Sequence, residues 1–234
     1  TNGIFYVRLE DTDTKREIAG TGEQVLKELK DFGIEPDESF LKEGKYSPYI
    51  QSKRKIIYDS VIAEMIKKDL AYPCFMTPSE LSELRKEQEK NKQNPGYYGE
   101  FARDRFLSDD EAIAKIKAGI DFVIRFKSPG KADKKVKVHD LIRCDLEIPE
   151  NTQDIVIMKN DGLPTYHFAH LVDDHFMHTT TITRGEEWLS SLPIHLQLFD
   201  TLGFSRPDYA HLPVIMKVDE NKQRRKLSNR KDPE

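Results

Sequence analysis

Two sets of strand-like and helical segments, one at each end of the chain, constrain its fold more than any other feature. Near the amino end, the apolar strand pattern of residues 3–10 precedes a helical pattern over residues 23–32. Near the carboxyl end, the β-rich run 179–183 precedes a helical pattern over residues 193–202. Because strands that alternate with helices are typical of α/β folds, we expect the two sets to be two parts of one sheet. The first strand is apolar enough to be largely buried.

The middle of the chain has a different pattern. Residues 77–80 and 108–111 are capping boxes, in which a Ser or Thr precedes a Glu by three positions, and each predicts the start of a helix. Strand-like runs follow at residues 121–126, 135–142 and 154–158. The simplest description is a mixed α+β module inserted between residues 71 and 160.

The bulk composition predicts a soluble, globular protein. Its 37% of hydrophobic residues can build a sizeable core, and no apolar run reaches the roughly 18 residues that a membrane span needs. Cys74 and Cys144 form no CxxC pair, so neither a disulfide framework nor a cysteine zinc site is indicated. These features favour a reducing, cytoplasmic setting. The chain begins at Thr1 next to a strand pattern and shows no leader, so we expect a fragment of a longer protein.

Two basic segments interrupt a chain whose net charge is -4. Residues 125–137 hold six basic residues and one acidic residue, and residues 217–231 hold seven basic residues and two acidic residues. Such segments are typical of polyanion contacts, because lysines and arginines placed against phosphates release counterions. A solvated charged loop is the alternative interpretation of either segment.

Residues 163–188 contain four of the seven histidines, beside a pair of aspartates, Asp173 and Asp174. Three interpretations are open: a metal site, structural hydrogen-bonding histidines, or a substrate pocket. Spacing argues against a single metal site, because no H-E-x-x-H pattern is present and the possible ligands face different ways on a helix. The histidines are His167, His170, His175 and His178.

Charged residues follow both of the expected strands. Glu10 comes at the end of the first strand, and Arg184 comes at the end of the strand of residues 179–183. Ligands of open α/β sheets bind at the carboxyl ends of the strands, where Glu10 would hold an ammonium group and Arg184 a carboxylate. That pair of charges suits an acidic amino acid. An ion pair of Arg184 with Glu186 or Glu187 is the structural alternative.

Five sequence blocks, in the same order and over nearly the whole chain, resemble the glutamyl-tRNA synthetases. They are VRLEDTD (7–13), SPYIQSKR (47–54), DGLPTYHFAHLVDDH (161–175), TRGEEWLSSLPIHLQLF (183–199) and RKLSNRKDPE (225–234). The resemblance implies a class I catalytic domain of Rossmann type, split by an inserted domain that binds the tRNA acceptor stem. It places the first catalytic part at 1–70, the insertion at 71–160, the second catalytic part at 161–205 and the start of a stem-contact region at 206–234. The amino-terminal strand and the HIGH motif of the family would precede Thr1.

The resemblance also implies a reaction and a set of site residues. Glutamate would attack the α-phosphate of ATP, and the acyl group of the resulting glutamyl-adenylate would pass to tRNA(Glu). Glutamate would contact Glu10, Tyr166, His170 and Arg184. ATP would contact Glu187, Trp188, Lys226 and Arg230, and the catalytic KMSKS-type loop would hold Lys226, Ser228 and Arg230. We expect ATP as a substrate, Mg²⁺ with it, and a monomeric cytoplasmic protein without membrane contact.

Three positions depart from the family pattern. Asn229 replaces the second lysine of the KMSKS-type loop, and His170 stands where many members have Asn. Met76 follows Cys74 where a zinc-binding relative would need a second cysteine, so we predict no zinc. Without the HIGH motif, this stretch of chain alone is expected to be inactive.

Related activities remain as alternatives to tRNA(Glu) charging. One is the transfer of glutamate to a modified tRNA base, and another is a glutaminyl-tRNA synthetase. Arg184 favours glutamate over glutamine, because a neutral amide would leave a buried cation without its partner. A third alternative is an inactive tRNA-binding paralogue, which Asn229 alone supports.

Overall fold

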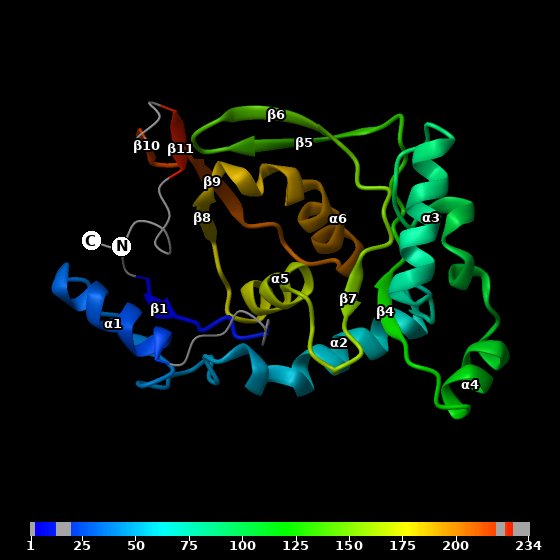
Figure 1. Cartoon of the computed structure of the whole chain (residues 1–234). Coiled ribbons are helices and arrows are strands. Elements are labelled where there is room, and N and C mark those ends of the chain that lie inside the picture. The colour runs from blue at the N-terminus through cyan, green and yellow to red at the C-terminus, as the bar shows by residue number, and fades with distance from the viewer. Residues whose placement is uncertain (1–2, 13–19, 219–222, 227–234) are drawn as a thin grey trace. The chain divides into compact units, whose positions relative to one another are not determined.

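The computed structural model describes residues 3–12, 20–218 and 223–226. The chain divides into two compact units, one formed by residues 1–129 and 152–177 and the other by residues 130–151 and 178–234. The α-helices are α1 (Thr21–Asp31), α2 (Lys55–Lys67), α3 (Pro78–Lys90), α4 (Asp109–Lys117), α5 (Tyr166–Phe176) and α6 (Leu192–Leu202) (Figure 1). The 3-10 helices are η1 (Gln51–Arg54), η2 (Gly99–Phe101), η3 (Arg103–Phe106) and η4 (Glu186–Ser191).

The strands fall into small sheets. In chain order they are β1 (Tyr6–Val7), β2 (Glu38–Ser39), β3 (Ala71–Cys74), β4 (Val123–Phe126), β5 (Lys135–Asp140), β6 (Cys144–Pro149), β7 (Val156–Met158), β8 (Thr181–Gly185), β9 (Asp208–Leu212), β10 (Met216–Val218) and β11 (Arg224–Lys226). The first unit holds the parallel pair β1–β2 and the antiparallel sheet β3–β4–β7. The second unit holds the sheet β6–β5–β9–β8 and the hairpin β10–β11.

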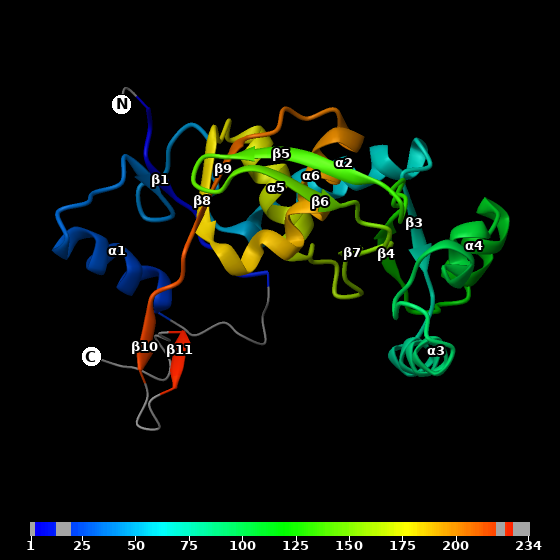
Figure 2. The same cartoon turned by 90° about the horizontal axis from the view of Figure 1, so that it is seen from above.

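The helices α3 and α4 of the first unit begin where the capping boxes predict. The Thr77 side chain accepts a hydrogen bond from the Glu80 backbone N–H, and the Glu80 carboxylate accepts one from Thr77 in return. Ser108 and Glu111 form the same reciprocal pair at α4. The helices α3 and α4 and the strands β3 and β4 lie in one region of the unit (Figure 2). Apolar residues of α3 pack there on a core cluster of Tyr72, Cys74, Tyr97 and Ala102.

The strand expected over residues 3–10 is much shorter in the structure. The strand that pairs with β2 is only Tyr6–Val7, because β2 offers two residues; Leu9 adds an isolated parallel bridge to Ile50, and Ile4 and Phe5 are exposed. The expectation of a largely buried strand was therefore wrong. The helix expected over residues 23–32 is confirmed as α1, and Gly33 follows it with a φ of +74°.

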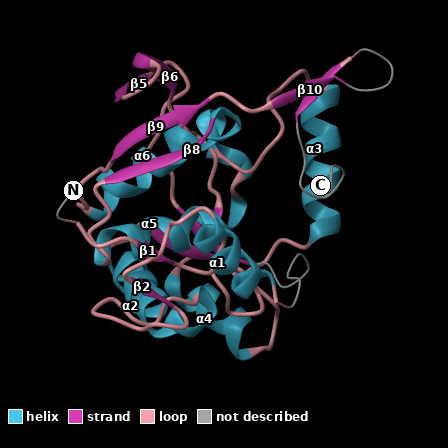
Figure 3. Ribbon diagram, turned by 90° about the vertical axis from the view of Figure 1, so that its left-hand side faces the viewer, coloured by secondary structure: helices cyan, strands magenta, loops and turns pink. Residues whose placement is uncertain are grey.

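The four-stranded sheet of the second unit combines strands that are distant in the sequence. The strands β8 and β9 pair in parallel, which sets Arg184 opposite His211. The hairpin β5–β6 joins them through a parallel bridge between Asp140 and Tyr209. Leu192 and Leu196 of α6 pack on this sheet around Tyr209. Figure 3 shows β8, β9 and α6 together.

The pairing of β5 with β9 was not anticipated from the sequence. It connects residues 135–149, which the sequence pattern assigned to an inserted module, with strands that follow that module in the chain. The strands β6 and β9 were themselves missed. The domain bounds given above remain predictions.

None of the helices in the described ranges has both the length and the apolar composition needed to cross a membrane.

Candidate functional site

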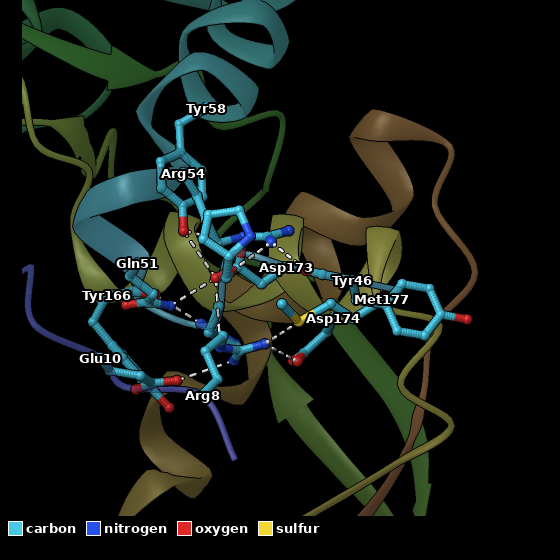
Figure 4. Close-up of polar contacts among 12 residues, drawn as sticks. Arg8, Glu10, Tyr46, Gln51, Arg54, Tyr58, Tyr166, Asp173, Asp174 and Met177 are labelled. Atoms are coloured by element: carbon cyan, nitrogen blue, oxygen red, sulfur yellow. Dashed lines mark hydrogen bonds and ion pairs between the residues drawn. The ribbon is translucent and has the colours of Figure 1, made fainter. Parts of the chain in front are cut away.

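A buried aspartate anchors helix α5 in the first unit. Asp173 is fully buried, and its carboxylate accepts hydrogen bonds from Arg54 Nε at 2.6 Å, Gln51 Nε2 at 2.9 Å and Tyr58 Oη at 2.8 Å (Figure 4). Burial and this carboxylate raise the pKa of Tyr58, so the phenol remains a donor. The network joins α5 to η1 and α2, and it fixes the face of α5 that carries the predicted site residues.

Arg8 is a cation whose charge is compensated. Its guanidinium lies 3.2 Å from Asp174 Oδ1, 3.0 Å from Glu10 Oε1 and 3.5 Å from Asp173 Oδ2. Burial alone would lower the pKa of Arg8, but the three carboxylates raise it above its ordinary value. Glu10 lies at the edge of this network, with 38% of its side chain exposed, and is accessible to a ligand.

Tyr166 and His170 lie one turn apart on α5. Their rings stack at a centroid distance of 4.7 Å and an angle of 15°. The His170 Nδ1 atom lies 2.7 Å from the Tyr166 carbonyl oxygen and must carry a hydrogen, since a carbonyl only accepts. The two predicted site residues therefore form one rigid unit, as their spacing on a helix indicates.

The two aspartates that a metal site in residues 163–188 would use already pair with other side chains. Asp173 is occupied by Arg54, Gln51 and Tyr58, and Asp174 pairs with Arg8. Within the described residues, no group of three or more His, Cys, Asp or Glu side chains has the arrangement of a metal site.

Arg184 in the second unit has a different environment from Arg8. Its Nε atom donates to His211 Nε2 at 3.0 Å, and its Nη1 atom donates to His195 Nδ1 at 3.0 Å. Its guanidinium carbon lies 5.1 Å from the centroid of the Tyr209 ring. The Nη2 atom is buried and has no hydrogen-bond partner in the part of the chain that the structure describes.

The ion pair of Arg184 with Glu186, which was one structural alternative, is not formed. Glu186 pairs with Arg143 instead. Among the described residues, no carboxylate lies at ion-pair distance from Arg184. A guanidinium with this surplus charge and a spare donor can bind a planar anion such as a carboxylate.

Asp140 contacts His211 at Nδ1, the ring nitrogen that Arg184 does not contact. Its Oδ2 atom lies 2.6 Å from His211 Nδ1, and both side chains are fully buried. Burial would raise the pKa of Asp140, but hydrogen bonds from His211 and from the backbone N–H groups of Arg143 and Ile142 lower it to about 2. Asp140 is therefore a carboxylate at neutral pH.

The remaining predicted site residues are only partly described. Glu187 is exposed and Trp188 is half-buried, both in η4 directly after β8. The backbone of Lys226 ends β11, whereas Ser228, Arg230 and the substituted Asn229 lie outside the described residues.

Comparison with known proteins identifies the family. The family model described as "tRNA synthetases class I (E and Q), catalytic domain" matches residues 1–233. The chain belongs to this family. The resemblance found in the five sequence blocks is thereby confirmed, as is the α/β class of the fold.

The relatives of this class I synthetase chain are longer proteins. A glutamate–tRNA ligase of Clostridium perfringens (strain SM101 / Type A) is 54% identical over 238 aligned positions, which cover 100% of this chain and 43% of the relative. A glutamate–tRNA ligase of Clostridium beijerinckii is 52% identical with the same coverage. The chain thus spans less than half the length of the curated relatives that it matches.

Solved structures of synthetases have the same fold. A glutamate tRNA ligase from Elizabethkingia meningosepticum, determined in complex with its amino acid, has a TM-score of 0.86 and 40% identity. The glutamate-tRNA synthetase from Elizabethkingia anophelis has a TM-score of 0.85 and 40% identity. Each comparison covers 97% of this chain, and 45% and 46% of the two solved chains, respectively.

The sequence interpretation of this synthetase chain missed three residues of the site. Asp140, His195 and His211 form the surroundings of Arg184. A buried histidine on a strand is a weak signal by itself, and only the pairing of β8 with β9 shows which side chain it faces.

Proposed function

We propose that the protein containing this chain is a glutamate–tRNA ligase. It would activate L-glutamate with ATP to form glutamyl-adenylate and pyrophosphate, and would then transfer the glutamyl group to the terminal adenosine of tRNA(Glu). The observation that carries this proposal is Arg184, a guanidinium with a buried spare donor and no carboxylate partner in the described part of the chain. Relatives that are 54% and 52% identical over the whole chain are glutamate–tRNA ligases.

Arg184 selects the side-chain carboxylate of the substrate. A carboxylate would accept charge-assisted hydrogen bonds from the guanidinium and would neutralise it. Glutamine would offer a neutral amide, so the cation would remain uncompensated. Arg184 therefore favours glutamate over glutamine, whose carboxamide has nearly the same shape.

Three further residues, Glu10, Tyr166 and His170, are proposed to contact glutamate. Glu10 would bind the α-ammonium group with the oxygen that faces away from Arg8. Tyr166 and His170 would form a wall of the pocket, and their stacking supports a fixed geometry. Asp173 holds α5, and so holds this wall, without contacting substrate.

ATP is proposed to bind near the end of β8. Trp188 would stack on the adenine and Glu187 would lie beside it. Lys226, Ser228 and Arg230 would form the KMSKS-type loop, whose cations would stabilise the charge that develops on the leaving pyrophosphate. Mg²⁺ would accompany ATP as part of this proposal, and we propose no zinc.

The finer architecture is part of the same proposal. The catalytic domain would be of Rossmann type and would comprise residues 1–70 and 161–205, divided by an acceptor-stem-binding domain at 71–160. Residues 206–234 would begin the stem-contact region. We further propose that the protein is a cytoplasmic monomer without membrane contact.

The exchange of labelled pyrophosphate into ATP tests the activation step. The full-length protein is incubated with L-glutamate and an unmodified tRNA(Glu) transcript, and glutamylation of the transcript is measured in parallel. We expect exchange and charging with glutamate, and neither with glutamine. Tight transcript binding without exchange would instead indicate the inactive paralogue, and exchange without charging of the transcript would indicate transfer to a modified base.

A further inference from the structure

The hydrogen bonds of Arg184 determine the protonation of its two histidine neighbours. A guanidinium only donates, so His211 Nε2 and His195 Nδ1 must each accept, at 3.0 Å in both cases. A protonated imidazole has no acceptor. Both histidines are therefore neutral, and they bind the guanidinium without reducing its positive charge.

Asp140 selects the tautomer that His211 needs. Its carboxylate lies 2.6 Å from His211 Nδ1, so the hydrogen of the neutral ring is on Nδ1. The lone pair is then on Nε2, where Arg184 Nε donates. The other tautomer would place two N–H groups against each other.

The ring of Tyr209 further limits the freedom of both side chains. It stacks on His211 at a centroid distance of 5.9 Å and an angle of 14°, and the Arg184 guanidinium lies over its face. The line from Asp140 through His211 to Arg184 runs across β5, β9 and β8 of one sheet.

We propose that Asp140 and His211 are positioning residues that orient Arg184 toward the side-chain carboxylate of the substrate and preserve its charge for glutamate selection. The inference rests on the proposed function. Asp140 is one imidazole ring away from the guanidinium, so it offsets part of the cost of a partly buried cation without forming an ion pair with it. A carboxylate in direct contact with Arg184 would compete with the substrate for the same donors.

The substitution Asp140→Asn separates this role from general stability. Asn keeps one oxygen, which can still accept from the backbone N–H groups of Ile142 and Arg143. Its amide group, however, donates to His211 Nδ1 and shifts the hydrogen of the ring to Nε2. Arg184 Nε then meets a donor instead of an acceptor.

Pyrophosphate-exchange kinetics of the full-length variant test the inference. We expect the KM for glutamate to rise about tenfold, equivalent to about 1.4 kcal/mol, with the KM for ATP unchanged. The preference for glutamate over glutamine should fall by a similar factor. The matched control is Asp145→Asn. Asp145 also lies 2.7 Å from a histidine Nδ1, that of His139, on the same hairpin, but this pair is exposed and no arginine of the described ranges bonds to it.

Two variants of His211 test the same inference if Asp140→Asn does not fold. His211→Gln retains an acceptor near the position of Nε2, whereas His211→Leu removes it. We expect His211→Gln to have a glutamate KM several-fold closer to that of the wild type than His211→Leu. If His211 acted through packing alone, His211→Gln would have no lower KM for glutamate than His211→Leu.

The outcomes are distinguishable. An active wild type in which Asp140→Asn leaves the glutamate KM unchanged, or raises the KM for ATP equally, would overturn this inference alone. Equal glutamate KM values for His211→Gln and His211→Leu would do the same. A wild-type protein without exchange would overturn the proposed function, and this inference with it.

Discussion

Two half-buried arginines of the chain, Arg8 and Arg184, differ in how their charge is balanced. Arg8 contacts three carboxylates, those of Glu10, Asp173 and Asp174 (Figure 4). Arg184 contacts two neutral histidines and an aromatic face, with no carboxylate at ion-pair distance among the described residues. Arg8 therefore stabilises the fold, whereas the charge of Arg184 is available to the ligand that we propose for it.

Replacing Arg184 with Ala should weaken glutamate binding selectively. Loss of hydrogen bonds to a charged group costs about 1.5–3 kcal/mol, so the KM for glutamate should rise about tenfold to hundredfold while that for ATP changes little. Steady-state pyrophosphate exchange measures both constants. Arg206→Ala is the control, because Arg206 belongs to the same unit and pairs with Asp200 at the surface. Equal rises in both constants for Arg184→Ala would mean that its partner is not glutamate.

The low pKa of Asp140 predicts a pH-dependent stability. Since the folded state lowers this pKa from 3.8 to about 2, the stabilising effect is complete above about pH 4 and is lost as the pH falls toward 2. The free energy of unfolding of the wild type, relative to that of Asp140→Asn, should therefore fall by about 2 kcal/mol between pH 4 and pH 2. Denaturant unfolding of both proteins across this range measures the difference, and a constant difference would contradict the assignment.

At the scale of elements, helix α5 depends on one buried carboxylate. Asp173 accepts from Arg54 of η1 and from Tyr58 of α2, and so joins three elements. Removing the charge of one member of a buried ion pair costs about 3–5 kcal/mol, because its partner is left uncompensated. The position of Tyr166 and His170 therefore depends on Asp173, which lies further along the same helix.

Asp173→Asn tests this dependence. We expect the free energy of local opening of α5 to fall by about 3 kcal/mol, measured by hydrogen exchange of its amides. Asp59→Asn is the comparison variant, since Asp59 pairs with Lys55 on the exposed face of α2 and a surface pair contributes at most about 1 kcal/mol. Similar losses in the two variants would show that Asp173 is not the anchor.

The elements also show what could be predicted from the sequence. The starts of α3 and α4 and the glycine that ends α6 were predictable, because caps depend on residues a few positions apart. The site around Arg184 was only half predictable. The position of Arg184 at a strand end could be predicted from the local pattern. Asp140 and His211, however, are 71 positions apart and meet only through the pairing of β5 and β8 with β9. No local pattern encodes that register.

At the scale of the whole molecule, charge is divided unevenly. The chain has a net charge of -4, yet residues 125–137 are strongly basic. The basic residues of this segment lie in two different environments in the structure. Arg125 is buried, donates to the Asp154 carbonyl oxygen and lies over the Tyr97 ring, so the polyanion interpretation was wrong for this residue. Lys131 and Lys134, by contrast, are exposed.

Exposed lysines in this segment should contribute to tRNA binding through charge alone. Replacing both Lys131 and Lys134 with Ala should reduce the slope of log affinity against log salt by about 1.5, because each lost phosphate contact changes it by roughly 0.7–0.9. Filter binding of full-length protein to tRNA(Glu) across salt concentrations measures the slope. The matched control replaces Lys67, the last residue of α2, and Lys68, which follows it; both are also exposed, and their loss should leave the slope unchanged. If both double variants change the slope equally, the attraction arises from overall charge, and the basic segment is only a solvated loop.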